Sequence, residues 1–119
     1  MSKKNILYIE DNRDTASAVK IILEGAGCNV ELAYTGKTGL KIAKNGFDLF
    51  LLDIMLPDMS GWDIFEKLKN TKSKFVFLSV IPVSKERIRE LKKVGISDYI
   101  TKPFVKEDLI KRVQKILKS

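Results

Sequence analysis

Residues 49–53, Leu-Phe-Leu-Leu-Asp, are four large apolar residues followed by a carboxylate. Two similar apolar runs occupy residues 6–9 and 75–78. Near-continuous apolar runs of this length are typical of strands covered on both faces, as in a parallel sheet between two layers of helices. The three runs therefore predict the centre of such a sheet.

Five expected strands alternate with five expected helices. The helical segments carry apolar residues at the three- and four-residue spacing of an amphipathic helix, and several are followed by Gly. Thr35 and Ser84 are expected to cap the second and fourth of them at the N-terminus. Right-handed crossovers then put helices on both faces of a parallel sheet, which predicts a three-layer α/β fold. The strands are expected at residues 6–10, 29–34, 48–53, 75–80 and 98–101, and the helices at 14–25, 36–45, 61–69, 85–94 and 106–117.

The composition indicates a globular protein and excludes several kinds of site. The chain has 119 residues, enough for one domain, of which 45% are hydrophobic and 31% charged. It contains no His, which excludes Ser-His-Asp or Cys-His catalysis and His-ligated metals, and a single Cys, Cys28, excludes an intrachain disulfide. Because no apolar run approaches the roughly 18–20 residues of a membrane span, we expect a cytoplasmic protein.

The formal net charge of +7 is unevenly distributed. Residues 1–60 contain 7 Lys/Arg and 8 Asp/Glu, whereas residues 61–119 contain 15 and 7. This excess of positive charge in the second half raises nucleic acid or an acidic protein as a partner. The alternative is that lysines on helix faces simply keep a small protein in solution.

Polar side chains stand at the carboxyl ends of the expected strands, where parallel α/β sheets form their binding crevice. Glu10 and Asp11 follow the first strand, and Asp53 ends the third. Neighbouring carboxylates repel one another unless one is protonated or a hard cation such as Mg²⁺ binds them through oxygen. Ser79 and Lys102, at the ends of the fourth and fifth strands, would then hold an anionic group beside the metal.

Two phosphate-binding motifs are excluded. Gly36-Lys37-Thr38 is similar to the end of a P-loop, but Glu31 stands where that loop requires a glycine. The dinucleotide fingerprint would need glycines after the first strand, where the chain has Glu-Asp-Asn-Arg at residues 10–13. Neither motif explains the strand-end residues.

Together, these residues resemble the receiver domain of two-component response regulators, over essentially the whole chain. An acidic pair follows the first strand, residues 53–61 read Asp-Ile-Met-Leu-Pro-Asp-Met-Ser-Gly, a hydroxyl ends the fourth strand, and Lys-Pro closes the fifth at residues 102–103. The resemblance implies a flavodoxin-like, doubly wound five-stranded parallel sheet of order 2-1-3-4-5 with helices on both faces, formed by residues 1–119 as one domain.

The resemblance also implies a phosphoacceptor and a metal site. Asp53 would accept a phosphoryl group from the phosphohistidine of a sensor histidine kinase or a histidine phosphotransfer protein. Asp11, Asp53 and the backbone carbonyl of Met55 would ligate Mg²⁺, for which Mn²⁺ can substitute, and Glu10 would assist through water. Such a protein dephosphorylates itself slowly and is not a turnover enzyme.

The remaining motif residues would bind the phosphoryl group and respond to it. Lys102 would pair with the phosphoryl oxygens, Ser79 would hydrogen-bond one of them, and Tyr99 would turn inward as Ser79 moves. The Lys102–Pro103 peptide would be cis. Val80 stands where the family usually has a small residue, beside the route to Asp53, so we expect it to slow phosphoryl exchange.

Several alternatives remain open. We expect a stand-alone receiver, monomeric or dimerising on phosphorylation, and the alternative is a receiver from a longer regulator. Its fourth helix, fifth strand and fifth helix would contact a downstream protein, acidic in view of the charge, with nucleic acid as the second choice. A small metal-dependent phosphohydrolase similar to the haloacid dehalogenases would have a second Asp where Met55 stands. A nucleic-acid-binding module would need a stacking platform or recognition-helix motif.

Overall fold

In a computed structural model that describes residues 3–118, the chain forms one five-stranded sheet, and every pair of neighbouring strands is parallel. The order is β2-β1-β3-β4-β5, as the family resemblance implies, which makes β1, β3 and β4 central and leaves β2 and β5 at the edges. The strands are β1 (Asn5–Ile9), β2 (Asn29–Ala33), β3 (Leu49–Leu52), β4 (Lys74–Ser79) and β5 (Asp98–Thr101).

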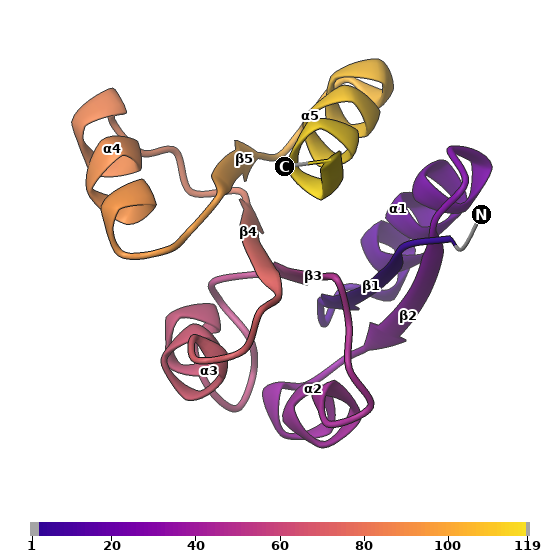
Figure 1. Cartoon of the computed structure of the whole chain (residues 1–119), viewed down its shortest axis with the longest axis horizontal. Helices are drawn as coiled ribbons and strands as arrows, with labels where there is room; N and C mark the ends of the chain where they lie inside the picture. Colours follow the sequence, from indigo (N-terminus) through magenta and orange to yellow (C-terminus); the bar gives the residue numbers. More distant parts are fainter. Residues whose placement is uncertain (1–2, 119) are drawn as a thin grey trace.

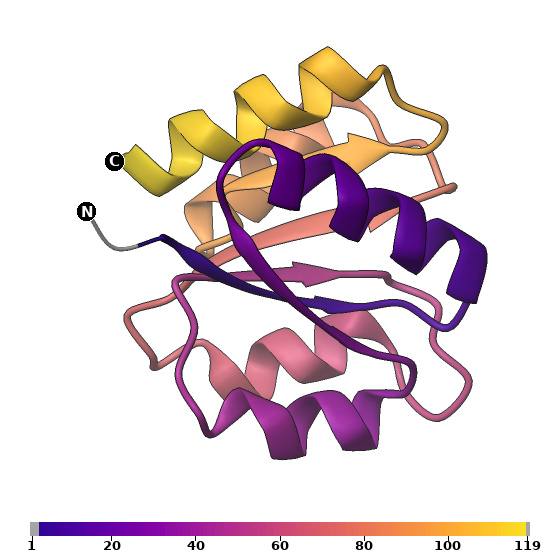
Figure 2. The ribbon, with the colours of Figure 1, turned by 90° about the vertical axis from the view of Figure 1, so that its right-hand side faces the viewer.

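Helices cover both faces of the sheet, giving three layers (Figures 1 and 2). On one face, α1 and α5 pack on alternate strand residues such as Ile6 and Leu51, whereas α2, α3 and α4 cover the other face and residues such as Leu7 and Phe50. This alternation follows from the two-residue period of a strand. The helices are α1 (Arg13–Gly25), α2 (Gly36–Ala43), α3 (Gly61–Leu68), α4 (Lys85–Lys93) and α5 (Lys106–Lys118).

The first four helices begin at residues whose side chains cap them. Asn12, Thr35, Ser60 and Ser84 each accept a hydrogen bond from the backbone N–H three residues later. Each bond satisfies one of the donors that a helix N-terminus leaves free. The expected caps Thr35 and Ser84 are therefore confirmed.

Four predicted strands extend one residue too far at the carboxyl end, past Ile9, Ala33, Leu52 and Ser79. The backbone N–H groups of Glu10 and Asp53 still donate to the neighbouring strand, to Ala33 O and Ile9 O. After these bonds the next backbone donors no longer pair with a strand. The Asn12 N–H donates to the Glu10 side chain and the Met55 N–H to the Asp53 side chain, and these local bonds turn the chain out of the sheet. The remaining predicted boundaries differ from the observed ones by two residues at most.

The N-terminus of α2 is occupied by a carboxylate of the chain itself. The Gly36 and Lys37 N–H groups each donate to Asp58, over 2.8 Å. These two bonds hold the pKa of the Asp58 carboxyl below its usual value. The segment that is similar to a P-loop is thus capped from the loop between β3 and α3, which ties that loop to α2.

Within residues 3–118, no helix has the length and apolar character needed to cross a membrane.

Candidate functional site

A pocket lies at the carboxyl edge of the sheet, at the ends of β1, β3, β4 and β5. The β1 end contributes the acidic pair, and the ends of β4 and β5 contribute a hydroxyl and an ammonium group. We call it the acidic pocket, and its lining consists of Glu10, Asp11, Asn12, Thr15, Ala18, Val19, Asp53, Met55, Ser79, Val80, Lys102, Pro103 and Phe104.

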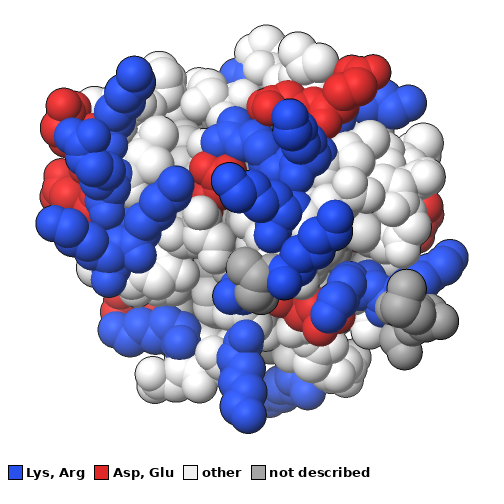
Figure 3. Space-filling model, turned by 45° about the horizontal axis from the view of Figure 1, so that its top comes forward, with Lys and Arg blue, Asp and Glu red and all other residues white. Residues whose placement is uncertain are grey.

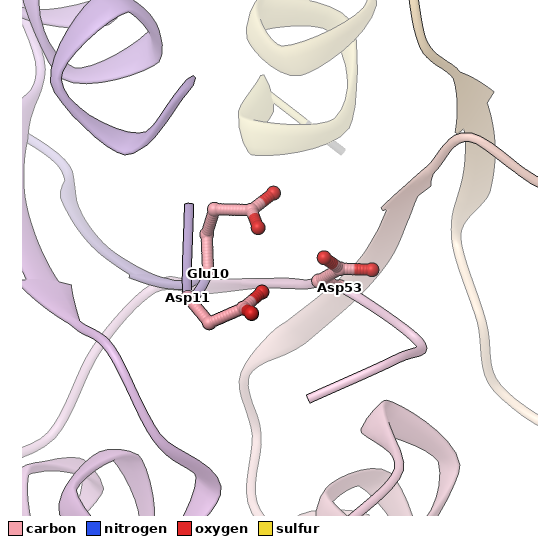
Figure 4. Close-up of side chains that lie close together, drawn as sticks. All are labelled: Glu10, Asp11 and Asp53. Atoms are coloured by element: carbon pink, nitrogen blue, oxygen red, sulfur yellow. The ribbon is translucent and has the colours of Figure 1, made fainter. Parts of the chain in front are cut away.

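Three carboxylates converge in the acidic pocket (Figure 4). Glu10 and Asp11 follow β1, Asp53 follows β3, and each offers an oxygen within 4.8 Å of the others. Glu10 and Asp53 are buried, whereas Asp11 is exposed. A set of hard oxygen donors, one of them open to solvent, fits a divalent cation such as Mg²⁺, which keeps several waters when it binds.

Glu10 is held on both of its oxygens. Its Oε1 accepts a hydrogen bond from the Tyr8 hydroxyl (2.9 Å) and contacts the Lys102 ammonium, and its Oε2 accepts from the Asn12 N–H (3.1 Å). Burial by itself raises the pKa of Glu10, but hydrogen bonds led by that from Lys102 outweigh burial and hold the pKa below its usual value. Glu10 is therefore a buried carboxylate that keeps its charge.

Asp53 is less well compensated. Its Oδ1 accepts from the Met55 N–H (3.1 Å), while its Oδ2 lies 3.7 Å from the Lys102 ammonium. Burial and the adjacent Glu10 raise the pKa of Asp53 to about 6. In the absence of a metal, Lys102 therefore neutralises Glu10 more closely than it neutralises Asp53.

Gly61 allows the loop after β3 to fold back on Asp53. A Cβ atom at position 61 would lie 2.3 Å from the Asp53 carbonyl oxygen, so any side chain here would collide with backbone. The Gly61 N–H donates to the Ile54 carbonyl (2.8 Å), which closes the loop. The glycine eight residues after Asp53 is thus a steric requirement of the site.

A chain of hydrogen bonds connects Ser79 with Tyr99. The Ser79 Oγ accepts from the Ile81 N–H (3.2 Å), and the Ile81 carbonyl accepts from the Tyr99 hydroxyl. Tyr99 is buried against Phe77 on the α4 face of the sheet, behind the acidic pocket and not in its lining. The Tyr99 side chain already lies inside the protein in this structure. Its inward turn on phosphorylation is therefore not tested and stays a prediction.

The other predicted site residues lie at the mouth of the acidic pocket. Val80 and Met55 line it and are about two-thirds exposed, at 65% and 64%. The Lys102–Pro103 peptide bond is cis, and both residues line the pocket. Apart from Tyr99, the pocket therefore contains every predicted site residue.

Sequence reasoning missed the part that Tyr8 and Asp58 play. In the sequence Tyr8 is one member of an apolar run. Residues two apart in a strand face the same side, so the spacing of Tyr8 and Glu10 could have predicted the hydrogen bond between them. Asp58 contacts α2 across 22 residues, and no local pattern marks such a contact.

A family model for the response regulator receiver domain matches residues 6–114. The chain belongs to the response regulator receiver domain family. The resemblance seen in the sequence is thereby confirmed, and so is the fold it implies.

Curated relatives and solved structures agree with this membership. The transcriptional regulatory protein CusR of Escherichia coli K12 is 36% identical over 116 residues, which cover 95% of this chain and 51% of CusR. A CheY-like receiver domain protein from Methanospirillum hungatei is 34% identical with a TM-score of 0.87, covering 98% of this chain and 95% of that one. The BeF3-activated DrrB receiver domain is 28% identical with a TM-score of 0.86, covering 99% and 100%. This chain spans about half the length of the curated relatives it matches.

Proposed function

We propose that this receiver domain, formed by residues 1–119, accepts a phosphoryl group on Asp53 in a Mg²⁺-dependent reaction. The donor is the phosphohistidine of a sensor histidine kinase or of a histidine phosphotransfer protein, and the protein acts in the cytoplasm. The observation that carries the proposal is the acidic pocket, in which Asp53 lies beside two other carboxylates, Lys102 and Ser79.

The transfer needs an ionised carboxylate and compensation of charge. An oxygen of Asp53 bonds to phosphorus as the P–N bond of the phosphohistidine breaks, and the electron pair of that bond returns to the imidazole nitrogen. With a pKa of about 6, Asp53 is mostly ionised at neutral pH and can attack. Lys102, 3.7 Å from Asp53, is close enough to turn from Glu10 toward the phosphoryl oxygens.

The residues present fit a bound Mg²⁺. Asp11, Asp53 and the Met55 carbonyl would hold it, with Glu10 assisting through water. When bound, Mg²⁺ would neutralise charge on the transferring phosphoryl group. Positioning and electrostatic compensation, rather than acid–base catalysis, supply most of the rate in such transfers, which suits a chain without His.

The response to phosphorylation would pass through the backbone of Ile81, whose N–H contacts Ser79 and whose carbonyl contacts Tyr99. The bond from the Ile81 N–H uses a lone pair of Ser79, so the Ser79 O–H can still donate to a phosphoryl oxygen. Because Tyr99 is buried already, phosphorylation would stabilise an arrangement that the protein samples before it is phosphorylated. Moving such an equilibrium from 1:99 to 99:1 takes about 5.5 kcal/mol of differential binding.

The surface of α4, β5 and α5 would carry the signal to a downstream protein. Lys and Arg side chains gather over α4 and α5 (Figure 3), with acidic side chains among them. An excess of positive charge favours an acidic protein partner over a neutral one. Self-association through this surface, in a monomer that dimerises on phosphorylation, is compatible with the same proposal.

Acetyl phosphate provides the test. With Mg²⁺ present, the wild type should gain the mass of one phosphoryl group, and Asp53→Asn should gain none. Asp108→Asn, which removes an exposed carboxylate on α5 outside the acidic pocket, should behave like the wild type. Labelling of Asp53→Asn, or sustained turnover of a phosphomonoester by the wild type, would contradict the proposal.

A further inference from the structure

We propose that Tyr8 is a positioning residue of the acidic pocket. Its hydroxyl donates a hydrogen bond to Glu10. When Lys102 turns from Glu10 to the phosphoryl group, the Glu10 carboxylate therefore still has a hydrogen-bond donor. This inference rests on the proposed function, since it concerns how the same pocket prepares for Mg²⁺ and for phosphoryl transfer.

The position of Tyr8 on β1 aims its hydroxyl at Glu10. The two residues are two apart, so both side chains face α1 and α5. Tyr8 is fully buried, and its hydroxyl donates to Glu10 Oε1 over 2.9 Å. Phe would fill the same space without the donor, and a buried phenol hydroxyl requires a polar partner.

Glu10 Oε1 is shared between two donors of different kinds. Lys102 brings charge but is also 3.7 Å from Asp53 Oδ2, the group it would serve after phosphorylation. Tyr8 is neutral and fixed in the core, and its pKa is raised well above the usual value, chiefly by burial. When Lys102 moves, Tyr8 and the Asn12 N–H therefore keep one hydrogen bond on each oxygen of Glu10.

This arrangement predicts a selective defect in Tyr8→Phe. Without the phenol, Glu10 would depend on Lys102 alone at Oε1, so its oxygens would be less well placed to assist the metal. We expect Mg²⁺ affinity to fall by about 2- to 10-fold, the effect of one hydrogen bond. Phosphorylation by acetyl phosphate should slow by a similar factor at low Mg²⁺ and recover at saturating Mg²⁺.

Calorimetric titration with Mg²⁺ tests the proposal on four variants besides the wild type. Tyr34→Phe is the matched control, because its ring packs against Arg13 and its hydroxyl lies outside the acidic pocket. It should keep wild-type affinity. Glu10→Ala should weaken binding, and adding Tyr8→Phe to Glu10→Ala should weaken it no further, because the side chain through which Tyr8 acts is then absent.

Three outcomes would overturn the inference: wild-type Mg²⁺ affinity in Tyr8→Phe, an equal loss in Tyr34→Phe, or the full effect of Tyr8→Phe in the Glu10→Ala background. If Tyr8→Phe does not fold, NMR of the wild type decides. A slowly exchanging Tyr8 hydroxyl proton should then shift as Mg²⁺ is added, and a signal that does not shift would overturn the proposal. Labelling of wild-type Asp53 by acetyl phosphate is measured separately. Absence of labelling would contradict the proposed function, whereas an unchanged Mg²⁺ affinity in Tyr8→Phe would contradict only the role of Tyr8.

Discussion

At the scale of single residues, Glu10 and Asp53 show how neighbouring carboxylates come to differ. Both are buried, but Glu10 has donors on both oxygens, whereas Asp53 receives one backbone bond and a more distant ammonium. The pKa of Glu10 is accordingly lowered, and that of Asp53 is raised to about 6. The residue proposed to react is thus the one whose charge the fold compensates least.

Stability should therefore depend on the ionisation of Asp53. Its pKa rises from 3.8 in the unfolded chain to about 6, so the folded state holds the proton more tightly. The contribution of Asp53 to the free energy of unfolding is fully present below pH 4 and is lost as the pH rises through 6. At neutral pH the folded state has therefore lost about 3 kcal/mol of stability, because Asp53 must ionise in a less favourable environment than in the unfolded chain. Without Mg²⁺, Asp53→Asn should therefore be more stable than the wild type at pH 7.5, by up to that amount, and little different at pH 4.

Urea unfolding at the two pH values, with chelator present, measures this difference. Asp108→Asn serves as the control, because it removes an exposed carboxylate outside the acidic pocket. A gain in stability for Asp53→Asn that is equal at pH 4 and pH 7.5 would contradict the prediction.

Val80 should control access to Asp53. It lines the acidic pocket and is 65% exposed, so Val80→Ala would widen the approach without opening the core. We expect faster phosphorylation by acetyl phosphate and a shorter lifetime of the phosphorylated protein, followed by mass spectrometry. Val105→Ala is a matched control, since Val105 is also 65% exposed but lies outside the pocket lining. Rates for Val80→Ala equal to those of the wild type would refute the role.

At the scale of elements, the loop between β3 and α3 links Asp53 to two helices. Gly61 lets the loop return against the Asp53 carbonyl, and Asp58 caps α2 from the same loop. A shift of this loop therefore moves both the proposed phosphoacceptor and the start of α2.

Gly61→Ala should disturb this loop. The new methyl carbon would meet backbone at 2.3 Å, which typically costs about 1–3 kcal/mol of stability and should also lower the reactivity of Asp53 toward acetyl phosphate. At Gly25, the last residue of α1, an added Cβ has nothing within 4 Å. Gly25→Ala should therefore be neutral or stabilising, by up to about 1 kcal/mol. Urea unfolding of both variants compares them, and equal stabilities would refute the steric argument.

Helix α4 should be the most loosely held of the longer helices. It buries one residue, Leu91, and most of its remaining residues are charged, whereas α1 and α5 bury three each. Local opening costs less where few apolar contacts are lost. Hydrogen exchange should therefore be faster for the amides of α4 than for those of α1 and α5, and equal protection would contradict this.

The sequence predicts elements well where one local pattern dominates. The apolar runs of β1, β3 and β4 identify the central strands, and Thr35 and Ser84 mark helix starts correctly. Strand ends are predicted less well, because Glu10 and Asp53 bend the chain through bonds made by their own side chains. The cap that Asp58 provides depends on contact between distant segments, which no local pattern contains.

At the scale of the whole molecule, metal binding and folding should be linked. A ligand that binds only the folded state adds RT ln(1 + [L]/Kd) to stability, about 2.7 kcal/mol at 100 times Kd. Added Mg²⁺ should therefore raise the Tm of the wild type, and chelator should reverse the rise. Asp11→Asn should keep a wild-type Tm in chelator, because Asp11 is exposed, but lose most of the rise. An undiminished rise in Asp11→Asn, measured calorimetrically, would exclude Asp11 as a ligand.

The parallel topology also sorts charge along the molecule. Helices in such a fold run opposite to the strands, so their first turns lie at the carboxyl edge of the sheet and their last turns at the amino edge. Acidic residues occupy the first turns of α1, α3, α4 and α5, and basic residues the last turns of α2 to α5, an arrangement that stabilises each helix.

These preferences favour acidic side chains at the carboxyl edge of the sheet, where the acidic pocket lies, and basic side chains at the amino edge. A charged partner that approaches to within a Debye length, about 10 Å at 0.1 M salt, therefore exerts a torque as well as a force. Phosphorylation of Asp53 would add negative charge at the carboxyl edge, so it would alter the orientation in which charged partners meet the protein before any surface contact forms.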